Sequence, residues 1–95
     1  MFRSILTIGI CLMFKMNAAD ASSPEAWKQF RIDVKNACIA AVARSLKNVS
    51  ASVDPYGSES FDLALLKGVS DTKPVSRICV YNKRSRKVEV GGDLE

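Results

Sequence analysis

The chain has 95 residues, a formal net charge of +4 and no histidine. This length corresponds to one domain, and the lack of imidazole excludes histidine-based catalytic triads and every zinc site with a histidine ligand. The small positive charge favours solubility and a weak attraction to anionic surfaces, but it is not the charge density of a nucleic-acid-binding protein.

Residues 1–21 have the order of a secretory signal peptide. Arg3 supplies the basic start, residues 5–14 form an uncharged, largely apolar run, and residues 19–21 are a small-x-small cleavage site. A membrane-spanning helix needs about 20 apolar residues, so this run is too short to remain as an anchor. We expect cleavage after residue 21, leaving a single small domain of residues 22–95 that is periplasmic or secreted. The alternative is a buried N-terminal helix.

Two cysteines, Cys38 and Cys79, remain after this cleavage. In an oxidising compartment we expect them to form one disulfide, which matters because so small a domain buries a limited core. Closing a loop of roughly 40 residues contributes about 4 kcal/mol in the chain-entropy model. The two cysteines are too far apart in sequence for a redox catalyst, whose cysteines lie one turn apart.

The next segment predicts one amphipathic helix. Ser23 is a suitable N-cap, Pro24 suits the first helical position, and Glu25 favours the positive end of the helix dipole. No glycine or proline follows until after Leu46, and the chain leaves the helix near Asn48. Apolar residues at three- and four-residue steps define the buried face: Trp27, Phe30, Val34, Ala37, Cys38 and Ala41.

A second apolar row lies on the opposite flank of this helix. Ile32, Ile39 and Leu46 are spaced by sevens, with Ala43 beside them. An exposed row of this kind can be a partner surface, and two such helices packed antiparallel would form a weak homodimer. Alternatively, the sheet curls around the helix and covers the row, or the residues are exposed singly without a role.

The rest of the chain predicts a small sheet. Residues 49–53 alternate apolar and polar, residues 54–57 suit a type I turn, and residues 75–81 are the clearest strand. Residues 60–67 fit a strand or a short helix, and flanking turns favour the strand. We expect residues 70–74 to be a loop. The predicted fold is α+β, with one N-terminal helix packed on a three- or four-stranded antiparallel meander sheet and one disulfide.

The Cys38–Cys79 disulfide would also orient the strand that contains Cys79. Because side chains alternate along a strand, Arg77 and Tyr81 would point toward the helix together with Cys79. Ile78 and Val80 would then lie on the far face of the sheet, which becomes a further candidate contact surface.

A basic cluster occupies the stretch between Tyr81 and Val88 and contains no glycine. We interpret it as a hairpin turn in which Asn82 or another residue takes a positive φ. No aromatic residue interleaves the cluster to stack on bases, and an exported protein rarely meets nucleic acid, so we expect no nucleic-acid partner. The remaining possibility is contact with an anionic envelope component or an acidic patch on a partner, through Lys83, Arg84, Arg86 and Lys87.

The sequence predicts no catalytic residues, metal or cofactor. Glu59 and Asp62 are a conceivable carboxylate pair, but no aromatic cleft accompanies them. No glycine-rich phosphate loop is present. Asn48 begins a glycosylation sequon that would be used only in a eukaryotic host. We therefore expect that the protein is not an enzyme.

Two stretches, ACIAAVARSLKNVSASV and RICVYNKRSRKVEVGGDL, resemble small exported proteobacterial proteins of unknown function. These proteins have a Cys-x-x-Ala-Val helix and a later cysteine-containing strand, and the resemblance implies a periplasmic location and a disulfide but no activity. The chain has Arg77 and Ile78 where these proteins tend to have an aromatic residue. The closing hairpin looks like that of PepSY-type domains, which are linked to the envelope and to protease inhibition. The matching residues are Cys38, Ala41, Val42, Cys79, Val88 and Val90.

These features favour a secreted or periplasmic binding or inhibitory module that acts on another envelope or secreted protein. The alternative is a structural, envelope-associated protein that its basic hairpin holds to anionic lipid or glycan. A salt-dependent attachment would distinguish the second from the first.

Overall fold

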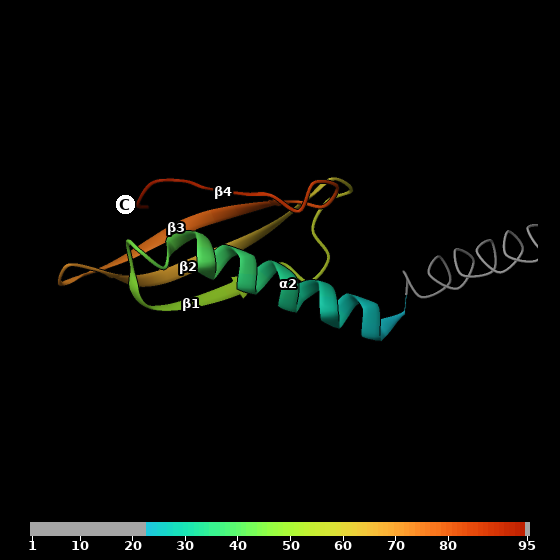
Figure 1. Ribbon diagram of the computed structural model, residues 1–95, viewed down its shortest axis with the longest axis horizontal. Helices are drawn as coiled ribbons and strands as arrows, with labels where there is room; N and C mark the ends of the chain where they lie inside the picture. The colour runs from blue at the N-terminus through green and yellow to red at the C-terminus, as the bar shows by residue number, and fades with distance from the viewer. Residues whose placement is uncertain (1–22, 95) are drawn as a thin grey trace, which may run out of the picture.

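The computed structural model describes residues 23–94, which form one helix followed by four strands (Figure 1). The strands make one antiparallel sheet in the order β1-β2-β3-β4, so the predicted α+β meander is confirmed, with four strands. The predicted signal peptide lies outside the described residues. The elements are α2 (Pro24–Val42), β1 (Lys47–Val53), β2 (Phe61–Ser70), β3 (Lys73–Asn82) and β4 (Val88–Val90).

Helix α2 begins as its sequence predicts. The Ser23 side chain accepts a hydrogen bond from the Ala26 N–H at 3.1 Å, and Pro24 follows it at the first position. The helix ends at Val42, earlier than expected, and the Val42 carbonyl accepts hydrogen bonds from the N–H groups of Ser45 and Leu46. This tight turn redirects the chain into β1.

The predicted inner face of α2 is confirmed for five of its six residues. Val34 and Cys38 are fully buried, and Trp27, Phe30 and Ala37 are half-buried. Ala41 is exposed, which corrects the prediction, because Val42 takes the inward position on the last turn.

Strands β2 and β3 pair along all ten residues of each, from Phe61 opposite Asn82 to Ser70 opposite Lys73. The ambiguous segment 60–67 is therefore strand from Phe61 onward. The loop expected at residues 70–74 is instead a two-residue turn between strand ends, with Asp71 at a φ of 57°. The extra paired residues lengthen the sheet at this end.

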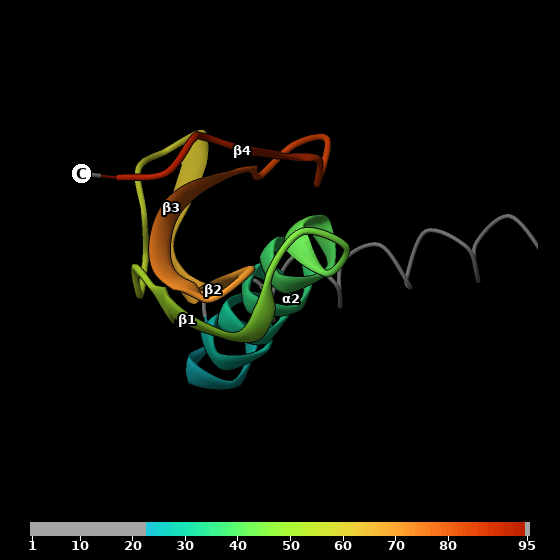
Figure 2. The same cartoon turned by 90° about the vertical axis from the view of Figure 1, so that its left-hand side faces the viewer.

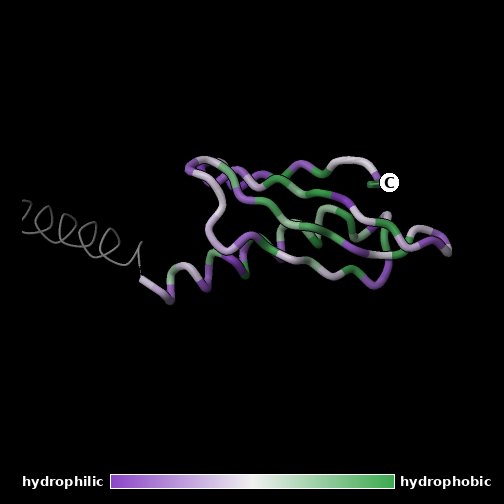
Figure 3. Tube along the Cα trace, turned by 180° about the vertical axis from the view of Figure 1, so that it is seen from behind, coloured by the Kyte–Doolittle hydropathy of each residue, from purple (hydrophilic) through white to green (hydrophobic). Residues whose placement is uncertain are grey.

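The sheet is curved and α2 lies on its concave side (Figure 2). The concave core consists of residues from the helix, its C-terminal turn, β2 and β3. Hydrophobic residues follow the strands, whereas the loops near the start of α2 are mainly hydrophilic (Figure 3). The buried hydrophobic residues are Val34, Cys38, Val42, Leu46, Ala64, Leu66, Cys79 and Tyr81.

The predicted disulfide joins Cys38 of α2 to Cys79 of β3, with Cα atoms 5.9 Å apart. Both cysteines are fully buried, so the bond lies in the core rather than at its margin. It ties the helix to a central strand and fixes which face of β3 is covered. As predicted, Arg77 and Tyr81 share the helix side with Cys79, while Ile78 and Val80 lie on the other face.

Candidate interaction surfaces

The convex face of the sheet has no layer of described residues over it and carries a row of apolar side chains. We call Leu63, Leu65, Ile78 and Val80 the convex band. Leu63 is 47% exposed and Ile78 40% exposed, while Leu65 and Val80 are half-buried. Leu63 pairs with Val80 and Leu65 with Ile78 in the β2–β3 register, so the four side chains are immediate neighbours.

The β1 side of the convex band is a shallow depression of about 260 Å³. Ser52 and Asp54 line it together with Leu63, Leu65 and Ile78. An apolar patch with a polar rim is typical of a protein contact surface. The sequence indicated Ile78 and Val80 for this face, but missed Leu63 and Leu65 because the type of their segment was ambiguous.

The second apolar row predicted on α2 does not form a continuous exposed surface. Ile32 is 41% exposed and Ala43 is exposed, but Ile39 is partly buried against the core and Leu46 is only 4% exposed. Leu46 does not continue the row because the helix ends at Val42 and the following turn points it inward. The helix-to-helix homodimer therefore lacks the row that it required.

Lys83, predicted as an anionic contact, has its ammonium group engaged within the molecule. Its Nζ donates to the carbonyls of Tyr56 at 2.7 Å and Ser58 at 2.6 Å. The same atom lies 5.6 Å from the centre of the Trp27 ring and 5.3 Å from that of Phe30, within cation–π range. These partners are distant in sequence, so the spacing of the basic residues gave no sign of the contact.

Arg84, Arg86 and Lys87 are exposed in the predicted turn between β3 and β4. The Asn82 side chain shapes this turn, since its Oδ1 accepts hydrogen bonds from the N–H groups of Arg84 at 2.9 Å and Ser85 at 3.0 Å. Arg86 takes the positive φ, 64°, that the absence of glycine led us to expect. The exposed cations therefore project from a hydrogen-bonded turn.

Asp62 is fully buried on the concave side of β2. Its Oδ1 accepts a hydrogen bond from the Leu63 N–H at 2.8 Å, while Oδ2 has no hydrogen-bond partner within the described part of the chain. Burial raises the pKa of this carboxyl; the Leu63 N–H opposes the rise, Asp54 adds to it and Lys83 opposes it. Glu59 is exposed and lines a cavity that does not include Asp62, so the two carboxyls do not share a cleft.

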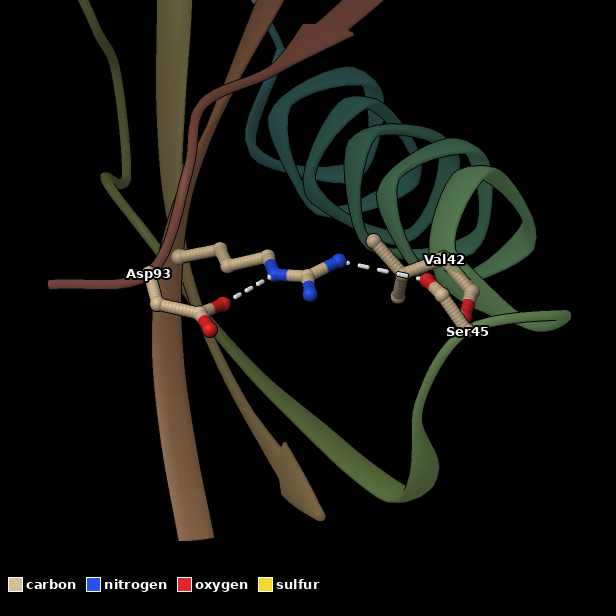
Figure 4. A network of polar contacts seen from close by, with 4 residues as sticks. Val42, Ser45 and Asp93 are labelled. Carbon is tan, nitrogen blue, oxygen red and sulfur yellow. Dashed lines mark hydrogen bonds and ion pairs between the residues drawn. The ribbon is translucent and has the colours of Figure 1, made fainter. Parts of the chain in front are cut away.

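Arg77 joins three parts of the fold rather than facing a partner. Its Nε donates to Asp93 Oδ1 at 2.6 Å and its Nη1 donates to Ser45 Oγ at 3.2 Å. Ser45 in turn donates to the Val42 carbonyl at 3.3 Å. Figure 4 shows Asp93 on one side of this network and Val42 and Ser45 on the other.

Within residues 23–94, no three histidine, cysteine, aspartate or glutamate side chains are arranged to hold a metal ion. No helix in the same range combines the length and the hydropathy needed to cross a membrane. Two surfaces of the described chain are candidate interaction sites: the convex band, and the loops that Lys83 connects.

Comparisons with protein-family models, with curated proteins and with solved structures find no match for this chain.

Proposed function

We propose that this protein is an exported, non-enzymatic binding module that recognises another envelope protein through its convex band. The observation that carries the proposal is the row of apolar side chains, with Leu63 and Ile78 at its most exposed points, on a sheet whose other face is filled by α2. Apolar surface left in water is unfavourable, and covering it with a partner releases that free energy.

The convex band is supported by a rigid framework. It lies on the two longest strands, which pair throughout, and the Cys38–Cys79 bond ties one of them to the helix. A preorganised face loses little conformational entropy when it binds, so more of its contact energy contributes to affinity. This rigidity suits recognition of a folded partner.

The size of the face limits the affinity. The length of β2 and β3 at the usual strand rise is about 30 Å, and the width of the four-stranded sheet at the usual strand spacing is about 15 Å. The whole convex face therefore measures roughly 450 Å². A stable complex usually buries about 800 Å² on each partner. We therefore expect a weak, reversible complex with a dissociation constant in the micromolar range or above, unless the partner also contacts neighbouring loops.

Export is the part of the proposal that rests on the sequence. The pattern of residues 1–21 and the resemblance to small exported proteins support it, and a buried disulfide is typical of oxidising compartments. The resemblance to PepSY-type hairpins suggests protease inhibition as one form of the binding role, by analogy of fold alone.

Site-specific photo-crosslinking tests the proposal. A photoreactive residue replacing Ser52, at the rim of the convex band, should cross-link one envelope protein in living cells. A Leu63→Asp substitution in the same chain should abolish the product, and the same photoreactive residue at Ala43, exposed immediately after the helix, should not give it. Equal products from both positions would contradict the proposal, as would a product with the mass of two copies of this chain.

A further inference from the structure

We infer that the loops at one end of the molecule form a contact site for an anionic lipid bilayer. The loop end comprises residues 54–61 and residues 83–87, which lie near the start of α2 (Figure 1). It presents two exposed aromatic side chains, Tyr56 at 60% and Phe61 at 45%. It also presents the cations of Arg84, Arg86 and Lys87. This site adjoins the convex band, since Phe61 lines a cavity with Leu63 and Val80, but a lipid surface as its occupant goes beyond the proposed function.

The aromatic and basic residues of the loop end are interleaved in space, although they are separate in sequence. Phe61 and Arg84 line one cavity of about 560 Å³, and Phe61 and Lys87 line an adjoining one of about 230 Å³. Aromatic side chains favour the boundary between headgroups and acyl chains, and lysine and arginine favour anionic headgroups. The combination is that of a peripheral membrane contact.

Lys83 makes the loop end one rigid unit. Besides the bonds from its ammonium to Tyr56 and Ser58, its backbone N–H donates to the Ser60 carbonyl at 3.0 Å. The Tyr56 ring also packs edge-on against Trp27 of α2, with centroids 5.2 Å apart. The exposed side chains are therefore held in a fixed arrangement before the protein binds lipid.

The point at which residues 1–22 join the domain also favours a lipid bilayer as the binding partner of the loop end. Residues 1–22 join the described structure at Ser23, and the Trp27–Tyr56 contact places that junction close to the loop end. Their apolar run, residues 5–14, has the pattern of an export signal, which resides in the membrane during translocation. In the precursor, the loop end then lies close to the residue at which this export-signal pattern joins the domain.

Charge favours a weak contact that depends on salt. Each exposed cation shares a cavity with a carboxylate, which offsets part of the positive charge: Glu59 with Arg84, Glu89 with Lys87 and Asp33 with Arg86. Screening of the remaining attraction should weaken binding strongly above about 300 mM salt, where the Debye length is shorter than about 6 Å. A single-stranded nucleic acid could use the same side chains, but the export pattern and the low net charge favour lipid.

Fluorescence of Trp27 tests the inference, since it is the only tryptophan in the chain and contacts Tyr56. The full chain is mixed with vesicles that contain brominated lipids, either zwitterionic phosphatidylcholine alone or with phosphatidylglycerol. We expect stronger quenching with the anionic vesicles than with the zwitterionic ones, because residues 1–22 are present in both mixtures. The double substitution Arg84→Gln and Lys87→Gln should weaken partitioning by about 30-fold, from about fivefold per charge. Phe61→Ser should weaken it roughly tenfold.

The matched control is Lys67→Gln with Lys73→Gln, which removes the same charge from exposed positions nearer the other end of β2 and β3. These substitutions should leave the quenching nearly unchanged. All of these full-length variants contain residues 1–22. A difference in quenching among them therefore reports the contribution of the loop end alone. An equal loss in the control, or full quenching in the loop-end variants, would overturn the inference. Tighter binding to a single-stranded oligonucleotide than to anionic vesicles would also overturn it.

Discussion

At the scale of single residues, the environment of Asp62 is unfavourable for a charged carboxylate. Its carboxyl is fully buried, one oxygen lacks a partner among the described residues, and burial raises its pKa above the usual 3.8. The folded state then binds the proton more tightly than the unfolded state. Between the usual pKa and the raised one, stability is therefore lost as the pH rises. Above the raised pKa the full cost of the buried charge is present.

We predict that Asp62→Asn stabilises the protein at pH 7. The amide oxygen can still accept the Leu63 N–H, and the substitution removes a buried charge, so the gain should be about 1 kcal/mol. The gain should shrink toward pH 3, where the native carboxyl is protonated. Urea unfolding at both pH values measures this, with exposed Glu59→Gln as control. A destabilisation at pH 7 would mean that the carboxylate is paired.

The Lys83 side chain should stabilise the folded state through its contacts. Lys83→Met should lower the free energy of unfolding by about 1–2 kcal/mol, because it removes two charge-assisted hydrogen bonds and the ring contacts. Arg84→Met, one residue further and exposed, is the matched control and should change stability by less than about 0.5 kcal/mol. Thermal unfolding of the two variants side by side decides the matter. Similar melting temperatures for both would show that the Lys83 contacts do not persist in solution.

At the scale of the elements, the turn after α2 determines which apolar residues are covered. Because the helix ends at Val42 and the chain folds back, Leu46 enters the core and the sheet approaches Ile39. Gly68 permits the close approach of β2 to this turn, since a Cβ there would lie 3.1 Å from the Lys47 carbonyl and 3.2 Å from the Leu46 Cβ. One part of this helix flank is therefore covered by the core, and the rest is exposed to solvent.

We therefore predict different outcomes for two isoleucines on α2. Ile39→Glu should destabilise the domain by about 2 kcal/mol or more, because it brings a charge against the partly buried margin of the core. Ile32→Glu, at a side chain that is 41% exposed, should be nearly neutral. Denaturant midpoints for the two variants measure this. Equal, small effects would restore the exposed row on the helix as a candidate surface.

Local rules were sufficient for the elements whose signals are local. Ser23 and Pro24 marked the start of the helix, its three- and four-residue steps gave the buried face, and the cysteines gave the covalent link. The helix end was missed because no glycine marks it, and tertiary packing of Leu46 decides it. The Lys83 contacts and the clustering of Phe61 with Arg84 depend on how distant loops meet, which periodicity does not encode.

At the scale of the whole molecule, the fold is a single curved sheet that covers one helix and is held by one core disulfide. So small a core leaves little margin of stability. We predict that Cys38→Ser with Cys79→Ser lowers the free energy of unfolding by about 4 kcal/mol, from the loop of roughly 40 residues. Calorimetry of this variant beside the native chain measures the loss. An unchanged melting temperature would show that packing alone is sufficient.

Competition for the cross-linked partner tests whether the convex band is the binding surface. Native chain, Leu63→Asp chain and Ile32→Asp chain are each added in excess to the chain with the photoreactive residue at position 52. Native and Ile32→Asp chains should suppress the partner product equally, since Ile32 lies on the helix, whereas Leu63→Asp should not. Equal suppression by all three chains would contradict the claim.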